Sequence, residues 1–356
     1  MIALFGNTRI LIFIAITLIA SSLLLYAESP KVKVFSLLLF FIYFVFSNHL
    51  NLTIKEEINI HNVIDVDTNY NHVRIFDYTG PPFKLFIKVM QINNELSSGM
   101  FVNTSELIPG HNTFYRQLSK HFNPKIEAAL MIGGAGYDYP KDFLNQYKEA
   151  TMDVVEIDPK VTELARQYFR LADNPCLTIF HEDGRIFLNR NQKKYDAVFI
   201  DAFNSYVVPH HLTTRETVQR IYDSLTEGGV VLVNLKSGLA GRNLRFLKAI
   251  KATYESVFPQ VFIFPVADPR PTELVQNIIL VGLKSTQKPR LESDDKETAR
   301  YLKHLFTQNL KNDLPLLTDE YAPVESYQSY GLQELRALFR KKFSSLLIKA
   351  RRFIDA

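Results

Sequence analysis

The sequence predicts an α/β protein whose core is a mostly parallel β-sheet, and three observations support this fold class. Apolar runs of strand length alternate with helical segments between residues 129 and 283. The first run, in ALMIGGAGYD, leads into a glycine-rich turn and a helix. The next three runs, in MDVVEID, LTIFHEDG and YDAVFIDAF, each end in an acidic residue. Because parallel strands end at the same edge of a sheet, these features predict a ligand pocket along that edge.

The glycine turn and the acids have separate expected roles in binding a nucleoside. The turn glycines, whose backbone can approach a ligand closely, are Gly133, Gly134 and Gly136. Glu156 lies twenty residues after Gly136, where an acid can accept hydrogen bonds from both ribose hydroxyls. Asp183 ends the third strand, where an acid can bind the exocyclic amine of adenine. Asp201 ends the fourth strand, above the place where chemistry is expected.

Two other interpretations of this pattern stay open. The acids could merely cap helices in a parallel-sheet domain, as Asp158 before Pro159 is expected to do. NAD sites use a similar turn and acid, so a dinucleotide is the second alternative. The acids after the third and fourth strands favour a single nucleoside, because a dinucleotide half-site does not need both.

Composition narrows the function classes. The 356 residues suffice for one large domain with accessory parts. The net charge of +4 argues against a dedicated nucleic-acid binder. A single cysteine, Cys176, excludes an intrachain disulfide framework and belongs to no metal-ligand cluster.

The N-terminal segment predicts a transmembrane hairpin. Residues 10–27 and 34–54 carry no charge, and each run is about long enough to cross a bilayer. A short polar turn joins them. A cleaved signal peptide and a pair of buried core helices are the alternatives.

The elements that follow divide between a small β domain and the large sheet. Residues 73–77 and 84–92 read as strands, with a tight turn at Asn93-Asn94, and residues 113–121 read as a helix. The further expected helices are residues 140–147, 159–169, 213–224 and 243–258. A strand at residues 230–234 follows an acid-Gly-Gly turn, and residues 261–266 and 277–283 predict an antiparallel edge pair.

The C-terminal residues 332–356 predict a basic amphipathic helix, which either contacts an anionic bilayer or packs on the main domain. The expected domains are a hairpin at residues 1–57, a β lid at 58–123, a nucleoside-binding domain at 124–330 and the basic helix at 331–356.

These motifs resemble the spermidine synthase (polyamine aminopropyltransferase) family, and within it the membrane-attached branch. The motifs that carry the resemblance are IGGAGYD, VVEIDP, HEDGRIFL, IDAFNSYVVPHHLTTRE and LTDEYAPVE, within about residues 65–324. The resemblance implies a Rossmann-like class I methyltransferase sheet, preceded by a small antiparallel β domain and the transmembrane hairpin. Members of the family bind decarboxylated S-adenosylmethionine and transfer its aminopropyl group to a diamine.

Carried over by position, the resemblance implies a donor site and an acceptor pocket. The implied nucleoside-binding residues are Gly133, Gly134, Gly136, Asp138, Glu156, Asp183 and Asp201. The implied catalytic residues are Asp201 and Asn204, with Asp201 facing the aminopropyl or amine end. The implied acceptor pocket consists of Tyr70, Tyr115, Arg116 and His210.

The acceptor half departs from the family pattern. Asn204 stands where the family has a second acid that serves as the base, and an amide cannot accept a proton at a useful pH. Family carboxylates are likewise replaced by His111-Asn112 and by Gln117, and a family Gln by Ser97. A diamine is a dication that needs carboxylates, so putrescine is expected to be a poor substrate.

Three functions remain in competition. The first is aminopropyl transfer to an altered amine acceptor, with Asp201, His210 or His211 taking the proton, although a loop without a catalytic role suits the two histidines better. The second is methyl transfer from intact S-adenosylmethionine, whose carboxylate Arg116 would hold. The third is a membrane-anchored protein that binds a nucleoside without chemistry.

The expected partners are a small-molecule amine or other nucleophilic acceptor and the lipid bilayer. A homodimer stays open, and neither nucleic acid nor a metal is expected. The expected location is membrane-anchored with the main domain on the cytoplasmic side, because nucleoside sulfonium compounds are made there.

Overall fold

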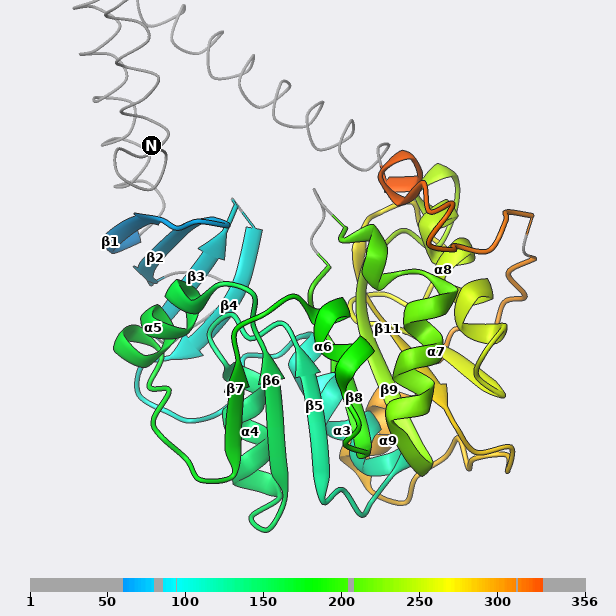
Figure 1. Cartoon of the computed structure of the whole chain (residues 1–356), viewed down its shortest axis with the longest axis horizontal. Helices are drawn as coiled ribbons and strands as arrows, with labels where there is room; N and C mark the ends of the chain where they lie inside the picture. The colour runs from blue at the N-terminus through cyan, green and yellow to red at the C-terminus, as the bar shows by residue number, and fades with distance from the viewer. Residues whose placement is uncertain (1–59, 80–85, 94, 204–207, 312, 329–356) are drawn as a thin grey trace, which may run out of the picture. The chain divides into compact units, whose positions relative to one another are not determined.

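The computed structural model describes residues 60–328, apart from residues 80–85, 94, 204–207 and 312 (Figure 1). The chain divides into two compact units. The first runs to Glu106 and includes Lys160–Arg170, and the second contains Leu107–Pro159 and the chain from Leu171 onward. Helix α3 (His111–Phe122) therefore belongs to the second unit, whereas the sequence analysis grouped it with the small β domain.

The first unit contains a four-stranded antiparallel sheet, as expected. Its strands follow chain order: β1 (Ile60–Asp67), β2 (His72–Tyr78), β3 (Ile87–Ile92) and β4 (Glu95–Phe101). Asn93 has a φ of 51° at the end of β3, a backbone conformation that asparagine tolerates in turns. Most of helix α5 (Pro159–Tyr168) also falls in this unit.

The second unit is built on a seven-stranded sheet. The strands in spatial order are β10 (Gln260–Pro265), β11 (Gln276–Leu283), β9 (Leu225–Ser237), β8 (Tyr195–Ile200), β5 (Ala128–Ile132), β6 (Thr151–Val155) and β7 (Leu177–Phe180). Strands β5 to β9 are parallel, while β11 pairs antiparallel with both β9 and β10. The predicted parallel sheet and its antiparallel pair are therefore confirmed.

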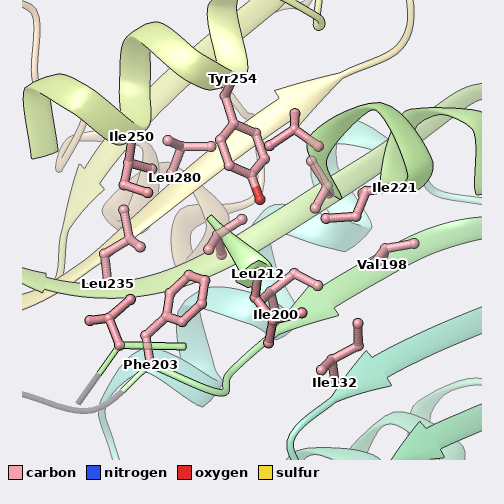
Figure 2. Close-up of a cluster of buried hydrophobic side chains, with 14 of the residues drawn as sticks. Ile132, Val198, Ile200, Phe203, Leu212, Ile221, Leu235, Ile250, Tyr254 and Leu280 are labelled. Atoms are coloured by element: carbon pink, nitrogen blue, oxygen red, sulfur yellow. The ribbon is translucent and has the colours of Figure 1, made fainter. Parts of the chain in front are cut away.

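Helices cover both faces of this sheet. The described helices of the unit, besides α3, are α4 (Asp138–Gln146), α6 (Gly184–Arg190), α7 (Arg215–Ser224), α8 (Arg245–Glu255), α9 (Lys296–Leu302) and the 3₁₀ turns η1 (His210–Leu212) and η2 (Arg242–Leu244). Alternate residues of β8 point to opposite faces. Phe199 packs against the rings of Tyr115 from α3 and Tyr139 from α4. Val198 and Ile200 join the apolar cluster that α6, α7 and α8 complete (Figure 2).

The strand order places a switch point at β5. The chain runs outward from β5 to β6 and β7, and then returns to β8 on the other side of β5. Ile132 pairs with Val155 on β6 and with Ile200 on β8, so the residues that follow these strands meet at one edge. Ligands of open parallel sheets bind at such a point, outside the carboxyl ends of the strands.

A short segment near the C-terminal end of the described chain, residues 317–319, closes the large unit, and we call it the clasp. The carbonyl of the fully buried Leu317 accepts a hydrogen bond from Arg215 N–H (2.8 Å). The carboxylate of Asp319 accepts from Thr214 Oγ1 (2.6 Å) and from Arg185 Nη2 (2.7 Å). The clasp therefore joins α6 to α7 and to the loop before α7.

The predicted hairpin at residues 10–54 and the predicted basic helix at residues 331–356 lie outside the described residues. Within the described part of the chain, no helix combines the length and the apolar character that a bilayer span needs. The longest described α-helix, α3, has 12 residues, whereas a span needs about 20. For the described residues, the prediction of a membrane-anchored chain is therefore wrong.

Candidate functional site

The glycine turn after β5 presses against the backbone that follows β8. Gly133 has a φ of 96°, in the region that favours glycine. A Cβ at this position would lie 2.5 Å from the carbonyl oxygen of Asp201. The backbone N–H of Asp201 in turn donates to the carbonyl of Ile132 (2.8 Å). The first glycine therefore permits the close approach that sets Asp201 beside the turn.

The remaining residues of the turn lead into α4. Gly136 lies in the turn, and Asp138 is the first residue of α4. Asp138 is mostly buried, and its Oδ1 lies 3.4 Å from the ammonium of Lys141. Their predicted contact with a nucleoside stays a prediction.

Glu156 supports the turn directly. Its Oε2 accepts hydrogen bonds from the N–H groups of Gly134 (2.8 Å) and Ala135 (3.2 Å), and its Oε1 accepts from Asp158 N–H (3.0 Å). Burial raises the pKa of Glu156, and the three backbone donors oppose that rise. A carboxylate offers about four acceptor positions, and these three backbone donors already use most of them. Glu156 is placed where the sequence predicted, and its role toward a ribose stays a prediction.

Asp183 caps helix α6. Its Oδ1 accepts from the N–H groups of Arg185 (2.8 Å) and Ile186 (3.2 Å), which are otherwise unpaired at a helix start. Its Oδ2 lies 3.0 Å from Nε2 of His211, and the two side chains are 26% and 37% exposed. Asp183 therefore caps α6, and its predicted contact with an adenine amine stays a prediction. The partly exposed Oδ2 could in addition accept from an adenine amine if His211 moved.

Asp201 lies at the centre of a polar group that we call the Asp201 cluster: His111, Asp201, Asn234 and Asn277. Asp201 Oδ1 accepts from Asn234 Nδ2 (2.9 Å), and Asp201 Oδ2 lies 3.1 Å from His111 Nε2. Burial alone would raise the pKa of Asp201, but His111, Asn234 and Lys236 together lower it below its ordinary value. Asp201 is therefore ionised at neutral pH.

The sequence analysis gave Asn234 no role, and it named His111 only as a replacement for a family carboxylate. His111 is the first residue of α3, and its Nδ1 lies 3.5 Å from Asn277 Nδ2 on β11. The amide oxygen of Asn234, on β9, is buried and has no hydrogen-bond partner among the described residues. Asn234 directly follows the apolar run of residues 230–233, and that position could have identified it. Nothing in the local sequence places His111 beside Asp201.

Tyr115 does not line an acceptor pocket. Its side chain is fully buried, and its hydroxyl donates to the carbonyl of Ile200 (3.1 Å). Burial and the nearby carboxylate of Asp201 raise the pKa of Tyr115 well above its ordinary value. The assignment is corrected because the aromatic packing with Tyr139 and Phe199 holds this ring in the core.

The assignment of Arg116 to the acceptor pocket is also corrected. Its Nε and Nη2 donate to Asp142 Oδ2 (2.8 Å) and Oδ1 (2.6 Å), which is a bidentate pair between α3 and α4. Burial raises the pKa of Asp142, and Arg116 opposes the rise. The guanidinium therefore balances a buried carboxylate of the scaffold.

Three predicted residues are not brought into the cluster. Tyr70 lies in the first unit, in the turn between β1 and β2, and is 56% exposed. His210 is exposed in η1, while its neighbour His211 contacts Asp183. Asn204 lies outside the described residues. The described residues also contain no group of three or more His, Cys, Asp or Glu side chains suited to a metal ion.

Comparison with known proteins relates this site to one family. Residues 115–289 match the family model described as "Spermine/spermidine synthase domain". The polyamine aminopropyltransferase of Vibrio vulnificus is 31% identical over 202 residues, which cover 56% of this chain and 64% of that protein. The probable polyamine aminopropyl transferase of Bifidobacterium longum is 27% identical over 232 residues, which cover 59% and 51%. The chain thus spans about half to two thirds of the length of these curated relatives.

A solved structure shows the same fold. The probable spermidine synthase from Corynebacterium glutamicum superposes with a TM-score of 0.58 at 20% identity, over 76% of this chain and 94% of that chain. The Rossmann-like α/β fold with a small N-terminal antiparallel sheet is therefore confirmed.

Proposed function

We propose that this chain, whose residues 115–289 match the spermine/spermidine synthase domain, transfers the aminopropyl group of decarboxylated S-adenosylmethionine to an amine acceptor other than putrescine. The observation that carries this proposal is the contact between the glycine turn and Asp201 at the switch point of the sheet. An anion at this position can hold a cationic amine next to the bound sulfonium donor.

The donor half of the proposal uses the strand ends. The turn from Gly133 to Gly136 supplies close backbone approach, and Glu156 fixes the turn through two of its N–H groups. Glu156 and Asp183 are the proposed ribose and adenine partners. The sulfonium supplies the electrophilic carbon, so positioning of donor and acceptor contributes most of the rate enhancement.

The acceptor half of the proposal is argued from the charges around Asp201. The partners of Asp201 identified above are His111, Asn234 and Lys236, and none of them is a carboxylate. One carboxylate with a histidine partner matches an acceptor with a single positive charge better than a dication. A second ammonium buried without an anion would be expensive.

The bidentate pair of Arg116 and Asp142 bears on the methyl-transfer alternative. Arg116 was the residue expected to hold the carboxylate of an intact donor, and it is committed to Asp142. No observation therefore favours intact S-adenosylmethionine.

The test compares two acceptors that differ in one charge. Putrescine and N-acetylputrescine share a primary amine and a four-carbon chain, but the acetyl group removes the second ammonium. With labelled decarboxylated donor at saturation, we expect the wild-type chain to prefer N-acetylputrescine by about tenfold or more in kcat/KM. Asp201→Asn is the matched control, and we expect it to lose activity with both acceptors.

Each other outcome identifies a different function. Turnover of putrescine at about 1 s⁻¹ or more would refute the acceptor assignment and leave ordinary aminopropyl transfer. Methyl transfer from the intact donor would establish the methyltransferase. Binding of 5′-methylthioadenosine without turnover of any amine would leave a nucleoside-binding protein.

A further inference from the structure

The contact between His111 and Asp201 has the form of a catalytic pair. His111 Nε2 lies 3.1 Å from Asp201 Oδ2, and the side chains are 21% and 17% exposed. Both residues are therefore mostly shielded from water but still reachable. An imidazole nitrogen oriented by a carboxylate is a common arrangement of a general base.

We propose that His111 takes the proton of the acceptor nitrogen during group transfer, with Asp201 as its orienting partner. This inference rests on the proposed function, because it assigns the base of that same reaction. Histidine ordinarily exchanges a proton between about pH 5 and 8, which suits this task.

The proposed transfer of the proton and the aminopropyl group conserves atoms and charge. The acceptor amine binds as an ammonium beside the ionised Asp201, and one N–H proton passes to His111. The freed nitrogen lone pair forms a bond to the aminopropyl carbon, and the carbon–sulfur bond breaks. The electron pair of that bond stays on sulfur, which leaves neutral methylthioadenosine. The pair of Asp201 and His111 thus changes from a net charge of −1 to 0.

The hydrogen bonds of His111 indicate which ring nitrogen carries the proton and which one can accept it. With Nε2–H donating to Asp201, the free lone pair is on Nδ1, which lies 3.5 Å from Asn277 Nδ2. This distance is long for a hydrogen bond, so Nδ1 is only weakly engaged. The amide of Asn277 holds both a donor and an acceptor, so it can serve Nδ1 before and after protonation.

Other candidate bases of the region are less suitable. Both oxygens of Asp201 are already engaged, and its lowered pKa makes it a weak base. The hydroxyl of Tyr115 is buried and donates to a carbonyl. His211 contacts Asp183, at the end of a different strand.

Charged and titratable groups near His111 come from its own helix and from the elements around it. Helix α3 packs against α4, α9, β9 and β11. The titratable or charged groups that we place near His111 are Asp201 after β8, Lys236 on β9 near Asp201, and Tyr115 on its own helix. β11 contributes the neutral Asn277.

The first experiment replaces His111 and compares it with another histidine of the same helix. His121 lies in the last turn of α3, where its Nε2 is 2.7 Å from the carbonyl of Arg290, so His121→Gln is the matched control. For His111→Gln we expect kcat/KM to fall by about 10²–10⁴-fold at neutral pH, and the acidic limb of the pH profile to disappear. Affinity for 5′-methylthioadenosine, measured by calorimetry, should stay within twofold of wild type.

The second experiment changes the partner of Nδ1. Asn277→Asp adds a carboxylate that stabilises the imidazolium, so the acidic limb of kcat/KM should move to higher pH. Added imidazole should restore part of the activity of His111→Ala.

The outcomes separate this inference from the proposed function. Two results would overturn the role of His111 alone while the wild-type chain turns over an amine. One is near-normal activity of His111→Gln, and the other is an unshifted acidic limb of the kcat/KM profile in Asn277→Asp. Equal losses of activity and of nucleoside affinity in His111→Gln would show a structural role and also overturn it. A wild-type chain inactive with every amine would overturn the proposed function itself.

Discussion

Replacing Gly133 with alanine tests the junction on which the candidate site depends. Gly133 has a φ of 96°, and an added Cβ would lie 2.5 Å from the carbonyl oxygen and 2.8 Å from the carbonyl carbon of Asp201. These atoms belong to the backbone, so a side-chain rotation cannot relieve the contact. Either the turn or the chain after β8 must move.

Two terms contribute to the expected loss of stability. An L-residue in left-handed backbone costs about 1–2 kcal/mol. An added methyl group in a well-packed place costs about 1–3 kcal/mol more. We therefore expect Gly133→Ala to lower the free energy of unfolding by about 2–5 kcal/mol.

A second glycine of the same unit separates the two terms. Gly228 has a φ of 78°, but a Cβ there would meet no atom within 4 Å. Gly228→Ala should therefore lose only the backbone term, about 1–2 kcal/mol, and should keep its affinity for 5′-methylthioadenosine. Urea unfolding and calorimetry of both full-length variants measure these quantities. Equal loss of stability in the two variants, or unchanged nucleoside affinity in Gly133→Ala, would refute the argument.

Two further predictions concern the charged groups around the site. Arg116→Leu leaves the buried Asp142 unpaired, so it should cost about 3 kcal/mol in urea unfolding at neutral pH, without loss of nucleoside affinity. Burial raises the pKa of Asp142 in the folded protein. The contribution of this carboxyl group to stability is therefore present below its unfolded pKa and is lost as the pH rises through the folded pKa. The loss of stability in Arg116→Leu should accordingly become smaller as the pH is lowered toward about 4. Asp183→Asn keeps a good N-cap residue, so thermal unfolding should find it more stable than Asp183→Ala by up to about 1 kcal/mol. If both Asp183 variants bind 5′-methylthioadenosine as well as wild type does, the carboxylate is a helix cap only.

The edge of the sheet that carries Gly133, Glu156 and Asp201 was predictable because its signals are local. Each strand and its terminal residue are adjacent in sequence, and parallel pairing brings such ends together without further information. The pairing of Ile132 with both Val155 and Ile200 realises that expectation. The positions of Gly133, Glu156 and Asp201 therefore follow from the sequence pattern.

The surroundings of Asp201 and the packing of α3 were less predictable because their contacts are long-range. Helical spacing indicates that Tyr115 and Arg116 point in different directions, but it does not say which side chain faces the core. The ring of Tyr115 is enclosed by residues of α4 and β8, and Arg116 finds Asp142 on α4. His111 meets Asp201 because α3 packs near β9 and β11. No local pattern encodes that placement.

The clasp has a consequence for the order in which the chain can fold during synthesis. Strands β5 and β6 can pair soon after they are made, because only α4 separates them in sequence. The hydrogen bond from Arg215 needs Leu317, and the one from Arg185 needs Asp319, so both exist only after residues 317–319 have been added. Contacts of such long sequence separation form late and slow folding. We therefore expect a growing chain that lacks residues 317–319 to hold α6 and α7 loosely, as a target for proteases and chaperones.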